Sequence, residues 1–366
     1  MKTLRPIGFA TVLGLLAWAG LAWAPAASAV TSHCLIINAA MNTSYTSLQA
    51  AQDAASAGGT LWVRGTCTGT TTISKNLTVT GQQPAGFTPP TLDGRGQGSV
   101  LTMRSVTVTI NTLTITGGNG TFVPDQDFTG GGGIYIEGGA LTLNSTAISD
   151  NAVSGPGGSG PGGGIFSLSG SVTLNGTSSI SGNTAGSVGG GIHNAGGTVT
   201  LNDSATVGDN TAFGGGGITN LDGSVTLNNS ATVSDNTASA GGGGITSSAT
   251  PPFTSASVTL NDTSSISGNT AGGRGGGIAN NFSTVTMNGS ATISGNTADF
   301  DGGGIGNFFG TVTMDANATI TRNTTSGNGG GIKNVCGTLN GAVAPPAPAP
   351  NVFGNHPDDI VNVCGD

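Results

Sequence analysis

Eight short glycine runs, each followed by an isoleucine, divide this chain into nearly identical units. Successive isoleucines are 31, 27, 26, 27, 33, 27 and 27 residues apart. They are Ile134, Ile165, Ile192, Ile218, Ile245, Ile278, Ile305 and Ile332. A period of this length is typical of solenoids, in which each unit stacks on the unit before it. The period therefore constrains the fold more strongly than any local propensity.

Each unit contains three short segments with the alternation of a β-strand. In Val199–Leu201, the valine and the leucine share one face while the threonine points the other way. Helices are excluded here because β-branched residues dominate and each glycine would cost about 1 kcal/mol. We expect an all-β, right-handed parallel β-helix solenoid of about 11 coils, with rungs about 4.8 Å apart.

Asparagine recurs in two columns at the strand exits. The first column contains Asn175, Asn202, Asn228, Asn261 and Asn288, and the second contains Asn183, Asn210, Asn236, Asn269, Asn296 and Asn323. Stacked amide side chains hydrogen-bond along the axis of a β-stack. The columns therefore predict two amide ladders.

The first 29 residues have the pattern of a signal peptide. Lys2 and Arg5 precede an apolar run, and Ala27–Ala29 is an Ala-x-Ala cleavage site. We expect cleavage near Ala29, a secreted mature protein and no membrane span in it, since no later apolar run reaches about 18 residues. The remaining chain divides into a cap with the first coils at 30–118, regular repeats at 119–335 and a C-terminal cap and tail at 336–366.

A short helix is expected before the first coils. Thr46 is a candidate N-cap with Gln49 three residues later, and Gly58 is a candidate stop. Its apolar side, which includes Leu48 and Ala51, would cover the open end of the solenoid.

The four cysteines lie in two pairs at opposite ends of the repeats. An even number in an exported chain suggests two disulfides, for which three pairings exist. We favour Cys34–Cys67 and Cys336–Cys364, because the two ends of a solenoid are far apart; catalytic or metal-binding cysteines are the alternative.

The charge balance argues against nucleic acid as a partner. Two of the nine basic residues belong to the leader, so seven basic and 17 acidic side chains leave a net charge of about −10. Affinity for phosphate backbones requires clustered lysine and arginine.

The repeat unit resembles those of a known family. Gly-Gly-Gly-Ile-x-Asn, as in 189–194, followed by Ser-Gly-Asn-Thr-Ala, as in 294–298, is similar to the repeats of chlamydial polymorphic outer membrane proteins. Glycine replaces the alanine of that family's motif, and Gly-Asn-Thr stands where its phenylalanine motif would be. The chain after residue 29 resembles right-handed parallel β-helix proteins of the pectin-lyase-like class. Such folds include adhesins, lyases and hydrolases, so the resemblance implies a fold and not a reaction.

A candidate binding site lies in the column that follows each repeat isoleucine. Tyr135, Phe166 and His193 occupy three successive units, and Glu137 shares a face with Tyr135. Insertions at 119–129 and 153–161 belong to the same units. These residues predict a shallow platform on which sugar rings stack; the alternative is that the insertions cover the rings as a satellite core.

The candidates for catalysis and metal binding are weaker. Asp209 and Asp235 fall on neighbouring rungs, roughly 5 Å apart, as the carboxylates of a retaining glycoside hydrolase do; the alternative is that aspartate and glycine are interchangeable turn residues there. The Gly-His-Gly signature of polygalacturonase-like enzymes is missing from the sequence. Asp125, Asp127, Asp299 and Asp301 are candidate calcium ligands. Calcium takes six to eight oxygens, so we predict no specific metal site and no cofactor.

Together these observations predict a secreted, non-enzymatic β-helix protein with a structural, adhesive or glycan-binding role outside the cell or at its surface. Its expected partner is an extracellular polysaccharide or a cell-surface glycan. The alternative is a polysaccharide lyase or glycoside hydrolase of the pectin-lyase-like fold.

Overall fold

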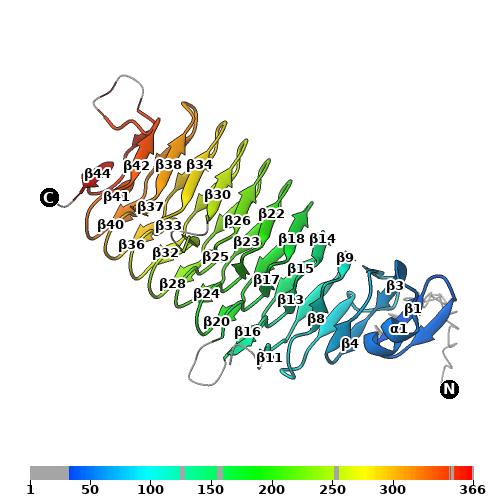
Figure 1. Cartoon of the computed structure of the whole chain (residues 1–366). Helices are drawn as coiled ribbons and strands as arrows, with labels where there is room; N and C mark the ends of the chain where they lie inside the picture. The colour runs from blue at the N-terminus through cyan, green and yellow to red at the C-terminus, as the bar shows by residue number, and fades with distance from the viewer. Residues whose placement is uncertain are drawn as a thin grey trace, which may run out of the picture.

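The computed structural model describes residues 33–123, 128–154, 160–250, 255–345, 347 and 350–364. The predicted signal peptide, Asp125 and Asp127 lie outside these residues. The described chain is a β-solenoid of about 10 turns with three long sheets (Figure 1). Its first and last coils lie at opposite ends of a rod (Figure 1).

The first sheet has 13 strands and contains the Val-Thr-Leu segments of the repeat. Its strands, in spatial order, are β2 (Thr43–Tyr45), β1 (Leu35–Asn38), β3 (Gly59–Arg64), β6 (Leu77–Gly81), β9 (Thr107–Asn111), β14 (Ala140–Asn144), β18 (Ser171–Asn175), β22 (Thr198–Leu201), β26 (Ser224–Leu227), β30 (Ser257–Leu260), β34 (Thr284–Met287), β38 (Thr311–Met314) and β42 (Thr338–Asn340). From β3 onward the neighbours are parallel.

The second sheet has 11 strands and contains the Ala-Thr-Ile segments. Its strands are β4 (Thr66–Thr68), β7 (Thr91–Asp93), β10 (Thr114–Thr116), β15 (Ala147–Ser149), β19 (Ser179–Ser181), β23 (Thr206–Gly208), β27 (Thr232–Ser234), β31 (Ser265–Ser267), β35 (Thr292–Ser294), β39 (Thr319–Thr321) and β43 (Val352–Phe353).

The third sheet, also of 11 strands, contains the repeat isoleucines. Its strands are β5 (Thr71–Ile73), β8 (Leu101–Arg104), β13 (Ile134–Glu137), β17 (Ile165–Leu168), β21 (Ile192–Ala195), β25 (Ile218–Leu221), β29 (Ile245–Ser248), β33 (Ile278–Asn281), β37 (Ile305–Phe308), β41 (Ile332–Val335) and β44 (Ile360–Val363).

Two smaller sets of strands complete the coils. A line of two-residue strands follows the second sheet and comprises β16 (Ala152–Val153), β20 (Thr184–Ala185), β24 (Thr211–Ala212), β28 (Thr237–Ala238), β32 (Thr270–Ala271), β36 (Thr297–Ala298) and β40 (Thr324–Thr325). The insertion after residue 118 forms an antiparallel hairpin of β11 (Thr121–Val123) and β12 (Phe128–Gly130).

The core and the glycine runs both follow from the stacking of identical coils. Inward side chains such as Ile192, Val199 and Leu201 are buried in one continuous cluster. The glycine runs pass so close to the next coil that a Cβ on Gly191 would lie 2.7 Å from the carbonyl oxygen of Gly217. Only glycine fits such a passage in every coil, which explains why the runs recur with the period.

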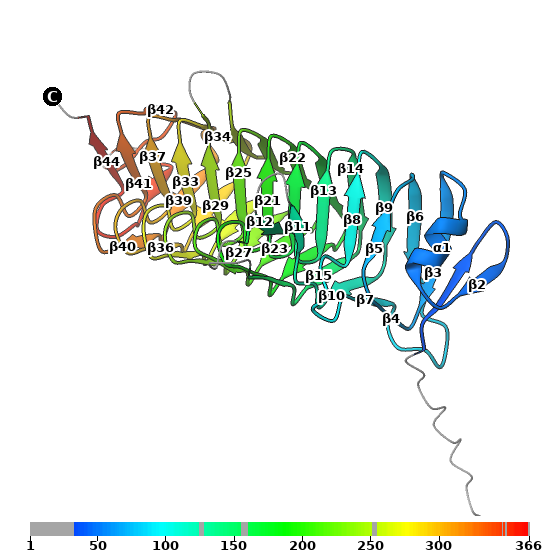
Figure 2. The ribbon, with the colours of Figure 1, turned by 60° about the horizontal axis from the view of Figure 1, so that its bottom comes forward.

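The N-terminal cap accounts for the difference between the predicted 11 coils and the observed 10 or so. Strand β1 pairs antiparallel with both β2 and β3, so this segment closes the stack and adds no coil. The predicted helix is α1 (Leu48–Ala54), which packs against β1, β2 and β5 at the end of the rod (Figure 2). Its N-cap is Ser47 and not Thr46, and it ends before Gly58.

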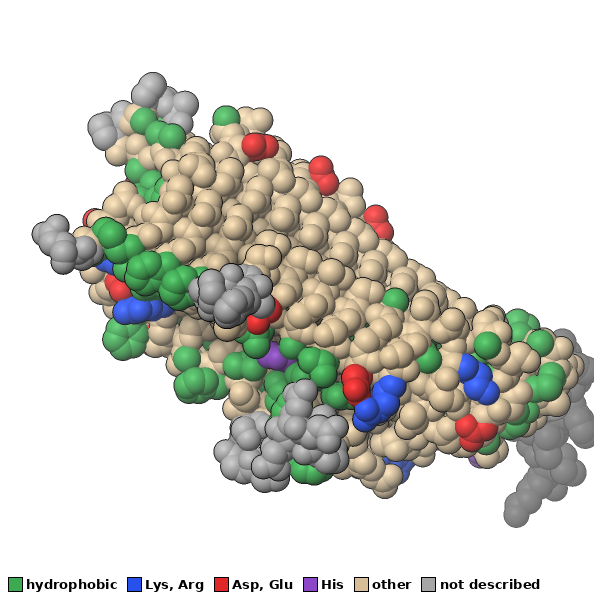
Figure 3. Space-filling view, in the orientation of Figure 1, with side chains coloured by type: hydrophobic (Ala, Val, Ile, Leu, Met, Phe, Trp, Pro, Cys, Tyr) green, Lys and Arg blue, Asp and Glu red, His purple; other side chains and the backbone are tan. Residues whose placement is uncertain are grey.

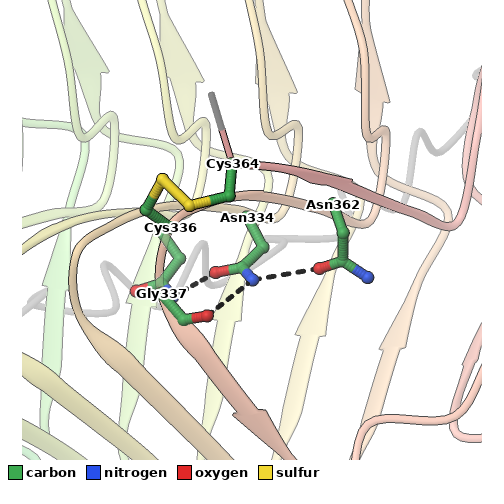
Figure 4. Close-up of a disulfide and its surroundings, with 6 residues drawn as sticks. Asn334, Cys336, Gly337, Asn362 and Cys364 are labelled. Atoms are coloured by element: carbon green, nitrogen blue, oxygen red, sulfur yellow. Dashed lines mark hydrogen bonds between the residues drawn. A yellow bond between two sulfur atoms is a disulfide. The ribbon is translucent and has the colours of Figure 1, made fainter. Parts of the chain in front are cut away.

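Both predicted disulfides are confirmed. Cys34–Cys67 joins the residue before β1 to strand β4. Cys336–Cys364 joins the residue after β41 to the residue after β44 (Figure 4). Disulfides persist in oxidising compartments, which indicates that the chain folds in such a compartment or outside the cell. Among the described residues, the seven-residue α1 is too short to cross a membrane, and no other helix of sufficient length and apolarity is present.

Both predicted asparagine columns form amide ladders along the rod axis. In the fully buried column, the Asn210 Nδ2 donates to the Asn236 Oδ1 at 3.0 Å, and the same contact continues from Asn151 to Asn355. In the other column, Asn202 donates to Asn175 at 2.8 Å. A third ladder, which was not predicted, lies on the inner face of the third sheet. It ends where the Asn334 Nδ2 donates to the Asn362 Oδ1 at 3.0 Å (Figure 4).

Candidate functional site

The outer face of the third sheet contains the residues that interrupt the repeat. Along each strand the first and third residues point into the core, so the second residue points outward, as the separate clusters of Ile134 and Tyr135 show. Strand register aligns this outward column from β13 to β41. It reads Tyr135, Phe166, His193, Thr219, Thr246, Ala279, Gly306 and Lys333. The side chains of this column are ring-shaped over β13, β17 and β21 and very small over β33 and β37, and this difference separates two regions of the face.

The first region is a covered ring cluster, made of Tyr135, Phe166 and His193. The Tyr135 and Phe166 rings stack with centroids 5.5 Å apart, and Phe166 and His193 stack at 5.1 Å. Phe128 of the β11–β12 hairpin meets Phe166 edge to face at 5.1 Å. Tyr135 is 0% and Phe166 2% exposed, so the insertion covers the rings as a satellite core and they present no exposed stacking platform. Their participation in ligand binding stays a prediction.

Glu137 joins this cluster at its edge, as predicted. Its carboxylate pairs with the Arg104 guanidinium of the preceding coil, and both side chains are about half exposed. The Arg104 guanidinium also lies 5.7 Å from the centroid of the Tyr135 ring. An arginine, a tyrosine, a phenylalanine and a histidine therefore stack on four successive coils.

His193 is a titratable residue buried within the ring cluster. Burial lowers the pKa of its imidazole to about 4, because the charged form loses its hydration. Its Nδ1 has no hydrogen-bond partner among the described residues. The ring is therefore neutral at pH 7 and belongs to the cluster as a flat apolar side chain.

Asp209 and Asp235 lie on neighbouring coils, at the exits of the paired strands β23 and β27. Both are exposed and have positive φ, at 56° and 57°. Gly182 and Gly268 have the same conformation at the equivalent turns of other coils. Aspartate and glycine are favoured in turns of this kind, so the column has a backbone explanation, although Arg322 adopts the same conformation in another coil. Catalysis by the two carboxylates stays a prediction.

The carboxylates proposed for calcium do not form a cluster in the described part of the chain. There, no group of three or more His, Cys, Asp or Glu side chains is placed to hold a metal ion. Asp299 is exposed, whereas Asp301 accepts a hydrogen bond from the Asn328 backbone at 3.0 Å.

The second region is an open hollow over β33 and β37, with a volume of about 420 Å³. Its floor is shallow because the outward column has only Ala279 here, whose register partner in β37 is the buried Gly306. Phe308 and Phe300 stand at its sides, and Phe300 is 63% exposed. It is lined by Ala240, Gly241, Gly273, Arg274, Ala279, Asn281, Phe300 and Phe308. Figure 3 shows hydrophobic side chains gathered over the C-terminal coils, beside basic and acidic ones.

Arg274 links the charges and the rings of the hollow. Its guanidinium lies 4.6 Å from the centroid of the Phe308 ring, a cation–π contact. Its Nε is 3.8 Å from the Asp301 Oδ2. Asn281 also lines the hollow, and its Nδ2 donates to the Ser248 hydroxyl at 3.2 Å.

An exposed pair of phenylalanines lies where the chain leaves the third sheet for the first. Phe282 and Phe309 follow β33 and β37, and their rings stack with centroids 5.1 Å apart. Both have positive φ, at 52° and 54°, which is a strained conformation for a bulky residue. The pair is about half exposed, so burial does not compensate for this strain.

The hollow was not predicted from the sequence, because the expected site rested on the large residues of the outward column. The hollow instead coincides with the smallest residues of that column, Ala279 and Gly306. Four of the 12 phenylalanines lie between residues 282 and 309. A small floor beside a local excess of aromatic residues indicates a hollow with aromatic sides.

Comparisons of this chain with protein-family models, with curated proteins and with solved structures found no match.

Proposed function

We propose that this protein is a secreted, non-enzymatic β-solenoid that binds carbohydrate outside the cell or at its surface through the hollow over β33 and β37. The observation that carries the proposal is the exposed Phe300 ring and the partly exposed Phe308 ring beside a shallow floor. The apolar faces of sugar rings pack against aromatic side chains, while their hydroxyls need polar partners such as Arg274 and Asn281. The hollow also falls within the roughly 300–1,000 Å³ typical of small-ligand sites.

Three features of the chain support an extracellular setting. The two disulfides require an oxidising environment. The first 29 residues have the pattern of a signal peptide. The repeats resemble those of chlamydial polymorphic outer membrane proteins, in the pectin-lyase-like class of folds. A rigid rod with an aromatic-lined hollow on its side fits an adhesive or structural protein.

The test is affinity electrophoresis in native gels that contain a panel of plant, algal and bacterial polysaccharides. At least one polysaccharide is expected to retard the protein, and Phe300→Ala and Phe308→Ala should abolish the retardation. Phe213→Ala is the matched control, because Phe213 is 60% exposed on the equivalent loop of another coil and does not line the hollow. Unchanged retardation of both variants would contradict the proposal. Release of reducing ends that Asp209→Asn abolishes would instead favour the enzymatic alternative.

A further inference from the structure

We propose that the hollow binds a neutral, linear polysaccharide that runs along the axis of the solenoid. This inference rests on the proposed function, to which it adds the charge, the minimum length and the direction of the ligand. It follows from the coils that contribute to the hollow and from the charges that line it.

The direction of the ligand follows from the loops that form the hollow. Gly241, Arg274 and Phe300 come from the loops of three successive coils, those that precede β29, β33 and β37. Neighbouring coils are about 4.8 Å apart, so the hollow extends about 10 Å along the axis. That length exceeds a single sugar ring and suits an extended chain of two or more.

The floor of the hollow is shallow at Ala279, which lines it. Its register partner Gly306 is buried, and a Cβ there would lie 3.4 Å from the Phe308 ring and 3.6 Å from the Arg274 Cβ, so these two side chains pack over it. Ala279 therefore leaves a shallow trough beside the rings. In the coils of β17 and β21 the equivalent positions are filled by Phe166 and His193. The trough is thus specific to these coils and is not a general property of the repeat.

The charge of the ligand follows from the pairing of Arg274. This is the one basic residue that lines the hollow, and Asp301 lies 3.8 Å from it. An anionic sugar would compete with Asp301 for the guanidinium, and it would also approach a chain whose net charge after residue 29 is about −10. A neutral sugar meets neither obstacle. The remaining guanidinium N–H groups donate to its hydroxyls, and the Asn281 side-chain carbonyl accepts from them.

The experiment compares neutral and anionic polymers on the full chain. Mixed-linkage β-glucan, xyloglucan and galactomannan are the neutral probes, and polygalacturonate and alginate are the anionic ones. We expect wild type to bind at least one neutral polymer, with an affinity that does not change between about 50 and about 500 mM NaCl. Oligosaccharides of that polymer should gain at least about tenfold in affinity from one to three sugar units, measured by titration calorimetry.

Two variants locate and explain the site. Ala279→Phe fills the floor with the residue that stands at the equivalent place in β17, and it should abolish binding of the neutral polymer without lowering the unfolding midpoint. Asp301→Asn keeps the acceptor for the Asn328 backbone but leaves Arg274 without its carboxylate partner. It should gain at least about tenfold in affinity for polygalacturonate and retain binding of the neutral polymer.

Each contrary outcome identifies the part that fails. Salt-sensitive binding of polygalacturonate by wild type, with none of the neutral polymers, would overturn the neutral ligand but leave carbohydrate binding intact. Equal affinity for one and three sugar units would overturn the axial chain. Full binding by a folded Ala279→Phe variant would remove the ligand from the hollow. If no carbohydrate binds, the proposed function itself fails.

Discussion

The ring cluster and the hollow lie on the same face of the same sheet, in coils that share one repeat. Over β13, β17 and β21 the outward column has Tyr135, Phe166 and His193, and a hairpin closes over them. Over β33 and β37 it has Ala279 and Gly306, and the face stays open. The strands follow the same repeat in both regions. The difference teaches that the outward residue of each coil, together with the insertion that packs over it, decides whether the face becomes a satellite core or stays open.

The two regions also share an arrangement of charges. Arg104 pairs with Glu137 beside the Tyr135 ring, and Arg274 pairs with Asp301 beside the Phe308 ring. In the ring cluster, the stacked rings fill the space next to the ion pair. In the hollow that space is accessible, so the same kind of contact becomes available to a ligand.

The largest expected effect contrasts the two phenylalanines of these regions. Phe166→Ala should destabilise the protein by about 3–5 kcal/mol, because a buried ring with aromatic neighbours on three sides is lost. Phe300→Ala should cost less than about 1 kcal/mol, because its ring is mostly exposed. Guanidinium unfolding followed by circular dichroism measures both. Equal losses would show that the hollow is as closely packed as the cluster.

The next effect concerns the pH dependence that His193 gives to the ring cluster. Its pKa is about 4 in the folded protein and 6.5 in the unfolded chain, so the unfolded state binds more protons between these values. Stability is therefore full above pH 6.5 and falls as the pH drops toward 4, by up to about 3 kcal/mol. In His193→Thr this component should vanish, since threonine occupies the column at Thr219 and Thr246.

The measurement for His193 is the difference in unfolding free energy between wild type and His193→Thr at pH 7 and at pH 4. Other titrating groups are common to both proteins, so the difference isolates the imidazole. A difference that does not change with pH would mean that the ring is accessible to protons in the folded state.

The smallest effect is expected at the exposed phenylalanine pair. Phe309→Gly removes a half-exposed ring from a residue with φ of 54° and relieves the strain of that conformation. The two changes oppose each other, so the unfolding free energy should stay within about 1 kcal/mol of wild type. A loss as large as that of Phe166→Ala would show that the pair is part of the core, which would reduce the contrast between the regions.

The sequence predicted the fold well because its evidence was periodic. Inward residues such as Val199 and Leu201 recur at the same place in each coil, so one unit predicts the others. The two asparagine ladders were predicted for the same reason, since stacking turns sequence columns into spatial columns. The disulfide pairing was predicted because a solenoid keeps its two ends far apart. The number of coils was overestimated because β1 pairs antiparallel, and no pattern in the sequence indicates strand direction there.

The candidate site was harder to predict because it depends on what covers a side chain. The register brings Tyr135, Phe166 and His193 together as expected, but their exposure depends on the hairpin with Phe128. The hollow depends on residues from three loops, of which Arg274 and Phe300 are 26 positions apart in the chain. Stacking of the coils brings these residues together, although they are far apart in the chain.

The sequence by itself determined the solenoid, its three sheets and the alignment of one outward residue per coil, because repetition and strand alternation act locally in each unit. Only the tertiary structure decided which part of that outward column is covered and which is open. Exposure depends on loops that fold back over the face, and the packing of those loops is a contact between residues far apart in the chain.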